Sequence, residues 1–152
     1  MLSSHSDRNW VFGQSVLMLA VVILGVTQRG AWHSEAGFAF GAVCFVLGAV
    51  TGIWGVRSLG RSRTPNPTPR PDSELVQHGI YRHLRHPLYS SVLLASLGWA
   101  LLWASIAAAV MTVVLCVFFD AKARLEERLM QTRFPEYAAY RQGTWRFLPG
   151  VY

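Results

Sequence analysis

The residues best suited to chemistry begin with the stretch Arg85-His86-Pro87-Leu88-Tyr89, which stands between a polar segment and a long apolar run. The residue before a proline avoids the α-helical conformation, whereas proline itself is favoured at the first helical position. This order predicts a helix that begins at Pro87, with His86 in the N-cap region. The free N–H groups of the helix start, together with Arg85, would then form an anion-binding corner.

An adjacent acid pair, Glu126 and Glu127, is the second chemical feature. Successive helical residues point about 100° apart, so only one of the pair is expected to face a ligand. That carboxylate could accept hydrogen bonds from an ammonium or from hydroxyl groups. The other is expected to pair with an arginine such as Arg85 or Arg128.

Aromatic side chains accompany both features, and their faces can bind a flat ring or a cation. The candidates are Tyr81, Tyr89, Phe134 and Tyr137. Each candidate also has a purely structural interpretation, as a positive flank of a membrane span, a helix cap, a surface ion pair or an interfacial tyrosine. None of these interpretations predicts that all the features occur together. His78, His83 and His86 have no cysteine or acidic ligand at standard spacing, so no metal is expected.

Composition defines the elements that must position these residues. The chain has 152 residues, enough for one domain, and 52% of them are hydrophobic, 14% are charged, and the net charge is +6. Its apolar residues form long blocks flanked by arginine, which favours a membrane protein over a nucleic-acid-binding one. We therefore expect an all-α polytopic membrane protein whose partner is the lipid bilayer, with no nucleic-acid partner.

Residues 10–28 and 37–56 each approach the roughly 20 residues that cross a bilayer core, and they predict two transmembrane helices. The third apolar run, 88–119, would make a single helix about 48 Å long, against a core of about 30 Å. Basic residues flank both of its ends, so we expect a helical hairpin that turns near residues 99–105, with each arm extending past the membrane on the cytoplasmic side. The result is four spans in the inner membrane of the cell, with both termini in the cytoplasm.

The hairpin brings residues 85–89 close to residues 120–127, although the two stretches are far apart in the sequence. Residues 120–133 continue the last span as a charged helix. Phe134-Pro135 interrupts that helix, and a short helix follows over residues 135–142.

Two segments near the predicted site keep alternative interpretations. The proline-rich piece 64–71 cannot be helical, and it is either a surface linker or a strap that leads to the site. The segment 145–149 is expected to be extended, and it either lies in the membrane interface or folds back over the site.

Taken in order, the chain carries Gly79-x-Tyr81-Arg82-x-x-Arg85-His86-Pro87-x-Tyr89, Glu126-Glu127, Phe134-x-x-Tyr137-x-x-Tyr140 and Arg146-Phe147-x-Pro149. This pattern resembles the isoprenylcysteine carboxyl methyltransferase family, and more broadly the integral-membrane methyltransferases that include phospholipid N-methyltransferases and a thiol methyltransferase branch. The resemblance covers residues 75–149 of a single domain, 1–152, and the two spans within residues 1–57 carry no signature. One departure is Ser91, where the family usually has glycine and where a side chain could narrow the cofactor pocket.

The resemblance implies S-adenosylmethionine (AdoMet) as cofactor, in a cytoplasmic pocket covered by the tail, and a lipophilic small-molecule or lipid-linked substrate that arrives from the bilayer. The cofactor-binding residues that it implies are Tyr81, His86, Pro87, Tyr89, Glu126, Glu127 and Tyr137. The catalytic residues that it implies are Arg85 and His86. The substrate-binding residues that it implies are Arg85, Tyr140 and Arg146.

O-methylation of a carboxylate is the first expectation, because a carboxyl group with a pKa of about 3.5 is already ionised and needs no base. Transfer from a sulfonium removes two opposite charges, so a dry site favours it, and Arg85 would hold one carboxylate oxygen. An amine or thiol acceptor would have to lose a proton, which would give His86 or a glutamate a role as base. An NADPH-dependent membrane reductase and a non-catalytic membrane scaffold are the remaining alternatives.

Overall fold

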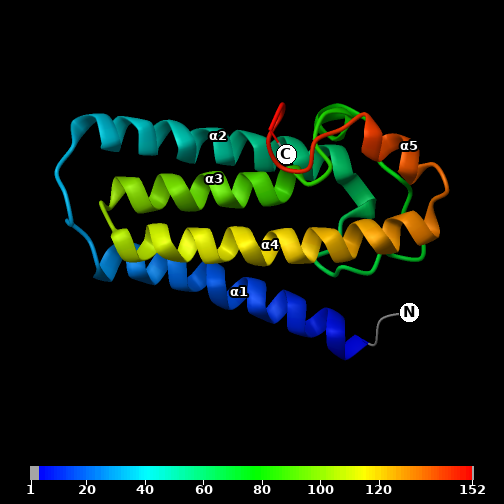
Figure 1. Ribbon diagram of the computed structural model, residues 1–152, viewed down its shortest axis with the longest axis horizontal. Coiled ribbons are helices and arrows are strands. Elements are labelled where there is room, and N and C mark those ends of the chain that lie inside the picture. Colours follow the sequence, from blue (N-terminus) through cyan, green and yellow to red (C-terminus); the bar gives the residue numbers. More distant parts are fainter. Residues whose placement is uncertain (1–3, 152) are drawn as a thin grey trace.

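A computed structural model describes residues 4–151 of the chain (Figure 1). Its helices are α1 (Ser4–Thr27), α2 (Glu35–Leu59), α3 (Pro87–Leu102), α4 (Ile106–Arg133) and α5 (Tyr137–Gln142). Two short 3-10 helices, η1 (Gly60–Ser62) and η2 (Gly79–Arg82), lie between α2 and α3. Strand-like pairing within residues 4–151 is limited to an isolated bridge between Leu84 and Trp145, so the all-α class is confirmed.

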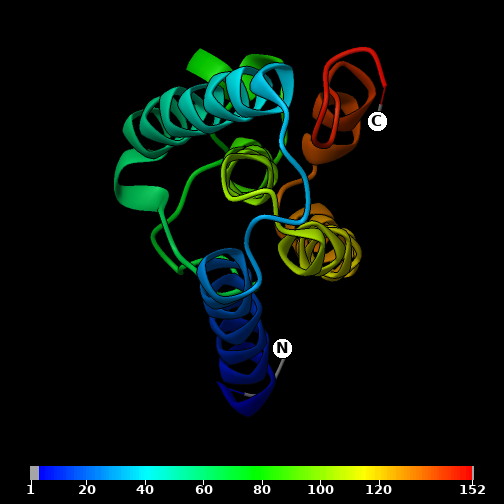
Figure 2. The ribbon, with the colours of Figure 1, turned by 90° about the vertical axis from the view of Figure 1, so that its left-hand side faces the viewer.

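The long helices run side by side (Figures 1 and 2). The helix α3 lies between α2 and α4, and α1 packs along the other side of α4. By length and composition α1, α2 and α4 can each cross a membrane. Large apolar side chains such as Phe12, Val46 and Val113 are exposed on them, as expected where lipid covers the surface. The protein is a multi-pass integral membrane protein.

The third of the four predicted spans, α3, is a shorter apolar helix of 16 residues. At 1.5 Å per residue it is about 24 Å long, which is less than a bilayer core of about 30 Å. Both hairpin arms were expected to extend past the membrane, and α4, with 28 residues, is long enough to do so, whereas α3 is not. The reason is local: Pro87 starts the helix, and His86 before it has a non-helical backbone (φ −126°, ψ 57°).

The turn between α3 and α4 lies at Trp103, Ala104 and Ser105, which confirms the predicted hairpin. The Ser105 Oγ caps α4 by accepting a hydrogen bond from the N–H of Ala108 (3.2 Å). The same hydroxyl donates to the carbonyl of Leu24 (3.0 Å), which ties the turn to α1. The start of α3 and the end of α4 therefore lie together at the other end of the bundle, which we call the polar end.

The helices α2 and α3 approach closely because both carry small residues where they meet. A Cβ added at Gly48 would lie 2.7 Å from the carbonyl oxygen of Ser91, and one at Gly98 would lie 2.6 Å from that of Gly41. Larger residues at these positions would push the backbones apart. This packing sets the rotation of α3 about its axis, and thus the direction in which its first residues point.

Segments outside the long helices close the polar end. The helix α4 ends at Arg133, and α5 begins at Tyr137, slightly later than the predicted short helix over residues 135–142. The segment 63–78 contains no helix, as its alternate prolines predicted, and it passes between α1 and α4.

Candidate active site

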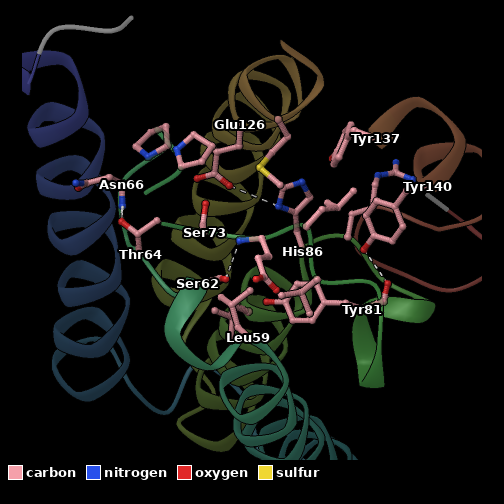
Figure 3. Close-up of a pocket in the computed structure, with 18 of the residues that line it drawn as sticks. Leu59, Ser62, Thr64, Asn66, Ser73, Tyr81, His86, Glu126, Tyr137 and Tyr140 are labelled. Carbon is pink, nitrogen blue, oxygen red and sulfur yellow. Dashed lines mark hydrogen bonds and ion pairs between the residues drawn. The ribbon is translucent and has the colours of Figure 1, made fainter. Parts of the chain in front are cut away.

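The polar end holds a cavity with about 850 Å³ of space not filled by atoms, part of it open to solvent (Figure 3). Seven of the predicted site residues line it: Tyr81, Arg85, His86, Tyr89, Glu126, Tyr137 and Tyr140. The hairpin therefore brings together side chains from η2, α3, α4 and α5, as the sequence predicted.

Three predicted site residues do not line this cavity. Pro87 is fully buried at the start of α3. Glu127 and Arg146 line a separate, arginine-rich cavity. The lining residues that sequence reasoning did not single out as site residues are Leu59, Ser62, Thr64, Asn66, Pro67, Pro69, Ser73, Glu74, Leu75, Val76, Leu88 and Met130.

The tail pairs with the chain just before α3. His86 is the N-cap and Pro87 the first helical residue, as expected, but the His86 side chain makes no capping hydrogen bond. The backbone N–H groups of Arg85 and His86 donate to the carbonyls of Trp145 and Arg146, at 2.8 and 3.1 Å. The tail therefore occupies the amides of the two residues that precede the helix, and the predicted anion-binding corner at the first turn stays a prediction.

His86 links the two glutamates at the cavity wall. Its Nδ1 lies 3.6 Å from Glu126 Oε2, and its Nε2 lies 3.4 Å from Glu127 Oε1. The imidazole stacks in parallel on Tyr89, with 5.3 Å between ring centres. Nε2 is buried and has no hydrogen-bond partner of good geometry among the described residues, which is uncommon for a buried polar atom. Within residues 4–151 no group of three or more potential ligands is placed to hold a metal ion.

Glu126 is the glutamate that faces the cavity. Its Oε1 accepts a hydrogen bond from the Tyr89 hydroxyl (2.5 Å) and lies 3.8 Å from Lys122 Nζ. The Tyr89 ring stacks on Phe119 (4.4 Å) as well as on His86, so the protein itself engages its faces. Tyr89 thus reaches the site through its hydroxyl, whereas the sequence suggested an aromatic face.

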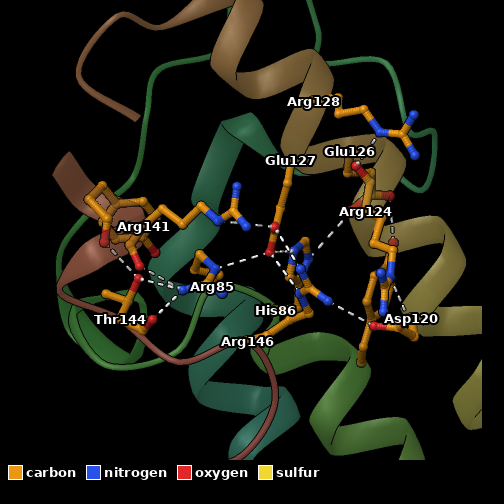
Figure 4. Close-up of polar contacts among 12 residues, drawn as sticks. Arg85, His86, Asp120, Arg124, Glu126, Glu127, Arg128, Arg141, Thr144 and Arg146 are labelled. Carbon is orange, nitrogen blue, oxygen red and sulfur yellow. Dashed lines mark hydrogen bonds and ion pairs between the residues drawn. The ribbon is translucent and has the colours of Figure 1, made fainter. Parts of the chain in front are cut away.

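Glu127 points away from the cavity and holds two arginines (Figure 4). Its Oε1 accepts hydrogen bonds from Arg85 Nε and Arg146 Nε, and its Oε2 accepts one from Arg146 Nη2, each at 3.0 Å. The three side chains are only 5%, 9% and 9% exposed. One glutamate therefore faces the cavity while its neighbour pairs with Arg85, as the helical offset predicted.

Arg85 is held from a second direction by the C-terminal segments. Its Nη1 donates to the carbonyl oxygens of Arg141 (3.0 Å) and Thr144. Together with Glu127, these contacts fix the guanidinium at the cavity wall between α4, α5 and the tail.

The tail takes the second of its two predicted courses and folds back over the site. The Phe147 carbonyl accepts a hydrogen bond from Ser90 Oγ (2.6 Å), and the Phe147 ring joins the apolar core. The Tyr140 hydroxyl donates to the carbonyl of Tyr81 (2.7 Å). Burial raises the pKa of the Tyr81, Tyr137 and Tyr140 hydroxyls well above the ordinary value for tyrosine, so these groups stay neutral at physiological pH.

The proline-rich segment is a strap, since it forms one wall of the cavity. Lys122 Nζ is buried and donates to the Pro65 carbonyl (2.8 Å) and to Gln14 Oε1 (2.7 Å). The Thr68 hydroxyl donates to Asp7 Oδ1 (3.1 Å). Sequence reasoning missed these anchors, although a single lysine among many arginines and a glutamine inside a predicted span were available signals.

Ser91, whose side chain could have narrowed the cavity, does not line it. Its Oγ donates to the carbonyl of Leu88 (3.0 Å) and lies beside Gly52 of α2, where an added Cβ would come within 2.9 Å of it. Two residues along a helix turn by about 200°, so Ser91 faces away from Tyr89. The glycine on α2 makes room for the serine on α3.

Comparison with known proteins agrees with this arrangement. A family model described as phospholipid methyltransferase matches residues 36–137. The solved structure of a eukaryotic intramembrane Ras methyltransferase, an isoprenylcysteine carboxyl methyltransferase, matches with a TM-score of 0.69 at 19% identity. The match covers 99% of this chain and 55% of that one, and at this identity it shows the fold.

Several curated proteins are similar in sequence. The cobalt-zinc-cadmium resistance protein CzcN of Cupriavidus metallidurans is 30% identical over 87% of this chain, and the nickel-cobalt-cadmium resistance protein NccN of Alcaligenes xylosoxydans xylosoxydans is 27% identical over 97%. The chain spans 58% and 66% of the lengths of these two proteins. A probable protein-S-isoprenylcysteine O-methyltransferase of Oryza sativa subsp. indica is 31% identical over 97% of this chain and 85% of its own length. The family model covers most of the chain, and the match to the rice relative covers nearly all of it. The protein therefore belongs to the phospholipid methyltransferase family of membrane methyltransferases, the group that includes the isoprenylcysteine carboxyl methyltransferases.

Proposed function

We propose that the protein transfers a methyl group from AdoMet to a lipophilic acceptor at the membrane edge, and that the reaction is O-methylation of a carboxylate. The observation that carries the proposal is the mixed lining of one cavity. Glu126 and His86 provide charged and polar groups, whereas Leu59, Val76 and Leu88 provide apolar surface. A charged cofactor and an apolar acceptor can meet in such a site.

The residues of the cavity fit AdoMet. Glu126 can accept hydrogen bonds from its ammonium or ribose hydroxyls, and Tyr81 and Tyr137 offer aromatic surface to its adenine or sulfonium. The His86 imidazole, whose Nδ1 lies 3.6 Å from Glu126, also lines the cavity. When bound, AdoMet supplies a methyl group activated by a positively charged sulfur. The protein's own contributions are alignment and the exclusion of water.

A carboxylate acceptor suits the arginine at the cavity wall. An acceptor carboxyl with a pKa of about 3.5 is ionised at neutral pH, so no residue has to remove a proton. Arg85, whose guanidinium is fixed by Glu127 and Thr144, orients the acceptor carboxylate in this proposal. Arg146 acts as a positioning residue through its hydrogen bonds to Glu127.

A second candidate is methylation of an amine or thiol. The observation that favours it is the position of His86, which lines the cavity between Glu126 and Glu127 and could receive a proton from the acceptor. The two candidates differ in their product: the first gives a methyl ester, whereas the second gives an N-methyl or S-methyl group.

The test is methyl transfer by the purified protein in lipid nanodiscs, with methyl-labelled AdoMet and a prenylated cysteine that carries a free carboxyl group. A methyl ester releases labelled methanol in base, whereas N-methyl and S-methyl products do not. We expect base-labile label, and none with the matched acceptor whose carboxyl is blocked as an amide. Base-stable label would overturn the carboxylate assignment. Failure to bind AdoMet in calorimetry would favour the scaffold, and oxidation of NADPH would favour the reductase.

We also propose that both termini and the loop over residues 57–86 face the cytoplasm. The support is the arginine-rich flanks of the hairpin and the position of α1, whose first residues lie at the polar end (Figure 1). Met1 to Ser3 and Tyr152 lie outside the described residues. A reporter fused after Tyr152 should behave as cytoplasmic, and an external location would contradict the topology.

A further inference from the structure

A second cavity, of about 500 Å³, lies beside Glu127 at the polar end (Figure 4). It is lined by Arg124, Glu127, Arg128, Gln131, Arg141 and Arg146. Four guanidinium groups from α4, α5 and the tail thus converge on one space. None of these four side chains lines the cavity proposed for catalysis.

Two of the arginines are paired with carboxylates. Arg146 bonds to Asp120 (2.8 Å) and Glu127 (3.0 Å), and Arg124 bonds to the same Asp120 (2.7 Å). The carboxylates of Asp120 and Glu127 are therefore already engaged by Arg124 and Arg146.

The other two arginines carry the excess charge. Arg128 donates from Nε to the carbonyl of Arg124 (3.3 Å), which is a neutral acceptor. Arg141 lies 3.8 Å from Glu127, and its side chain is 52% exposed. Four arginine side chains thus accompany only two carboxylates, those of Asp120 and Glu127. Arg128 and Arg141 can therefore reorient toward an added anion.

The cavity continues a lipid-facing stripe on α4. Exposed apolar side chains follow one another on this face at Val110, Val113, Val114 and Val117. The face then passes through exposed Ala121 to exposed Arg124 and Arg128. A bilayer core of about 30 Å takes about 20 helical residues, so a core that begins at Ile106 ends near Leu125. The apolar run of α4 itself ends at Phe119, and Arg124 and Arg128 follow about 8 and 14 Å further along the helix, at the depth of lipid headgroups.

We propose that this arginine cavity binds the phosphate of an anionic phospholipid, whose acyl chains lie along the apolar stripe of α4. The planar forks of arginine match phosphate oxygens in bidentate geometry. Basic pockets beside membrane spans recognise anionic headgroups in this way. The stripe assigns the phosphate to a lipid and not to free phosphate in solution. The bound lipid does not react, so the proposal is independent of the methyl acceptor.

The test measures binding of phosphatidylglycerol to the full-length protein in detergent by native mass spectrometry, with phosphatidylcholine as the neutral lipid. The variant is Arg128→Gln/Arg141→Gln. The matched control is Arg57→Gln/Arg61→Gln, which removes the same charge from exposed positions near the end of α2. A basic residue near the membrane contributes about 5-fold to anionic-lipid affinity, so the cavity variant should bind about 30-fold more weakly. The control should change affinity less than about 3-fold, or about 0.7 kcal/mol, because its two arginines do not line the cavity.

Equal losses in both double variants would show general charge attraction and overturn the proposal. So would wild-type affinity in the cavity variant, or displacement of the lipid by inorganic phosphate at equal concentration. Arg128→Gln alone should give about a 5-fold loss, and it serves if the double variant unfolds.

Discussion

Replacing the two adjacent glutamates one at a time should separate cofactor binding from structural support. Glu126 faces the cavity with one hydrogen bond from Tyr89, whereas Glu127 accepts three hydrogen bonds from Arg85 and Arg146. Glu126→Gln keeps the shape of the side chain and removes its charge, so it should weaken AdoMet binding by about 1.5–3 kcal/mol, the range for a hydrogen bond to a charged group. This loss corresponds to a Kd raised about 10- to 150-fold.

Glu127→Ala should act on stability. It would leave two arginines, each with a side chain 9% exposed, without their shared carboxylate. Breaking a buried ion pair by removing one partner costs about 3–5 kcal/mol in the free energy of unfolding. For a chain of this size, that loss corresponds to a melting temperature lower by roughly 6–20 °C.

The assays are calorimetric titration with AdoMet and thermal unfolding followed by tryptophan fluorescence, both in the same detergent. Glu136→Gln is the matched control, because this exposed acid lies outside the cavity near the start of α5. If Glu126→Gln binds AdoMet as the wild type does, Glu126 has no role in cofactor binding. If Glu127→Ala melts at the wild-type temperature, the buried ion network does not support the fold.

Three further predictions concern the pH dependence of the reaction, the proline-rich strap, and Ser91 at the position where the family usually has glycine. The rate of single-turnover methylation should be constant from pH 6 to 9, because the acceptor carboxylate is ionised and burial keeps the pKa of the cavity tyrosines above this window. Arg85→Lys should lower this rate about 10- to 1000-fold. A steep rise of the rate with pH that depends on His86 would contradict the carboxylate assignment. Lys122→Met removes the hydrogen bond to Pro65, so limited proteolysis should cut the strap faster than in wild type; equal rates would mean that other contacts hold it. Ser91→Gly should leave AdoMet affinity unchanged within about 3-fold because the side chain faces α2, and a larger gain would mean that Ser91 does restrict the site.

The start of α3 and the hairpin could be predicted from the sequence because both depend on local or additive properties. Backbone sterics at His86-Pro87 determine where the helix begins, whatever surrounds it. The charges that flank residues 88–119 and the length of that run exclude a single helix. The shared polar end of α3 and α4, and with it the meeting of His86 and Glu126, follows directly from the hairpin.

The rotation of each helix about its axis could be predicted only in part. Sequence spacing implied that Glu126 and Glu127 face different directions, but only the packed bundle decides which of them faces the cavity. The direction of Ser91 relative to Tyr89 was available from helical geometry alone, although its effect on the cavity was left open. The glycine that makes room for it, Gly52, lies on another helix, and no local rule pairs the two.

Contacts between distant segments belong to the tertiary structure alone. The tail carbonyls of Trp145 and Arg146 accept hydrogen bonds from the two amides just before α3, and Lys122 joins the strap to α1 through Pro65 and Gln14. A sequence states which donors and acceptors a chain contains, but it does not state which of them become neighbours. That choice follows from how the buried helices pack, because each polar group that packing removes from water must find a partner near it.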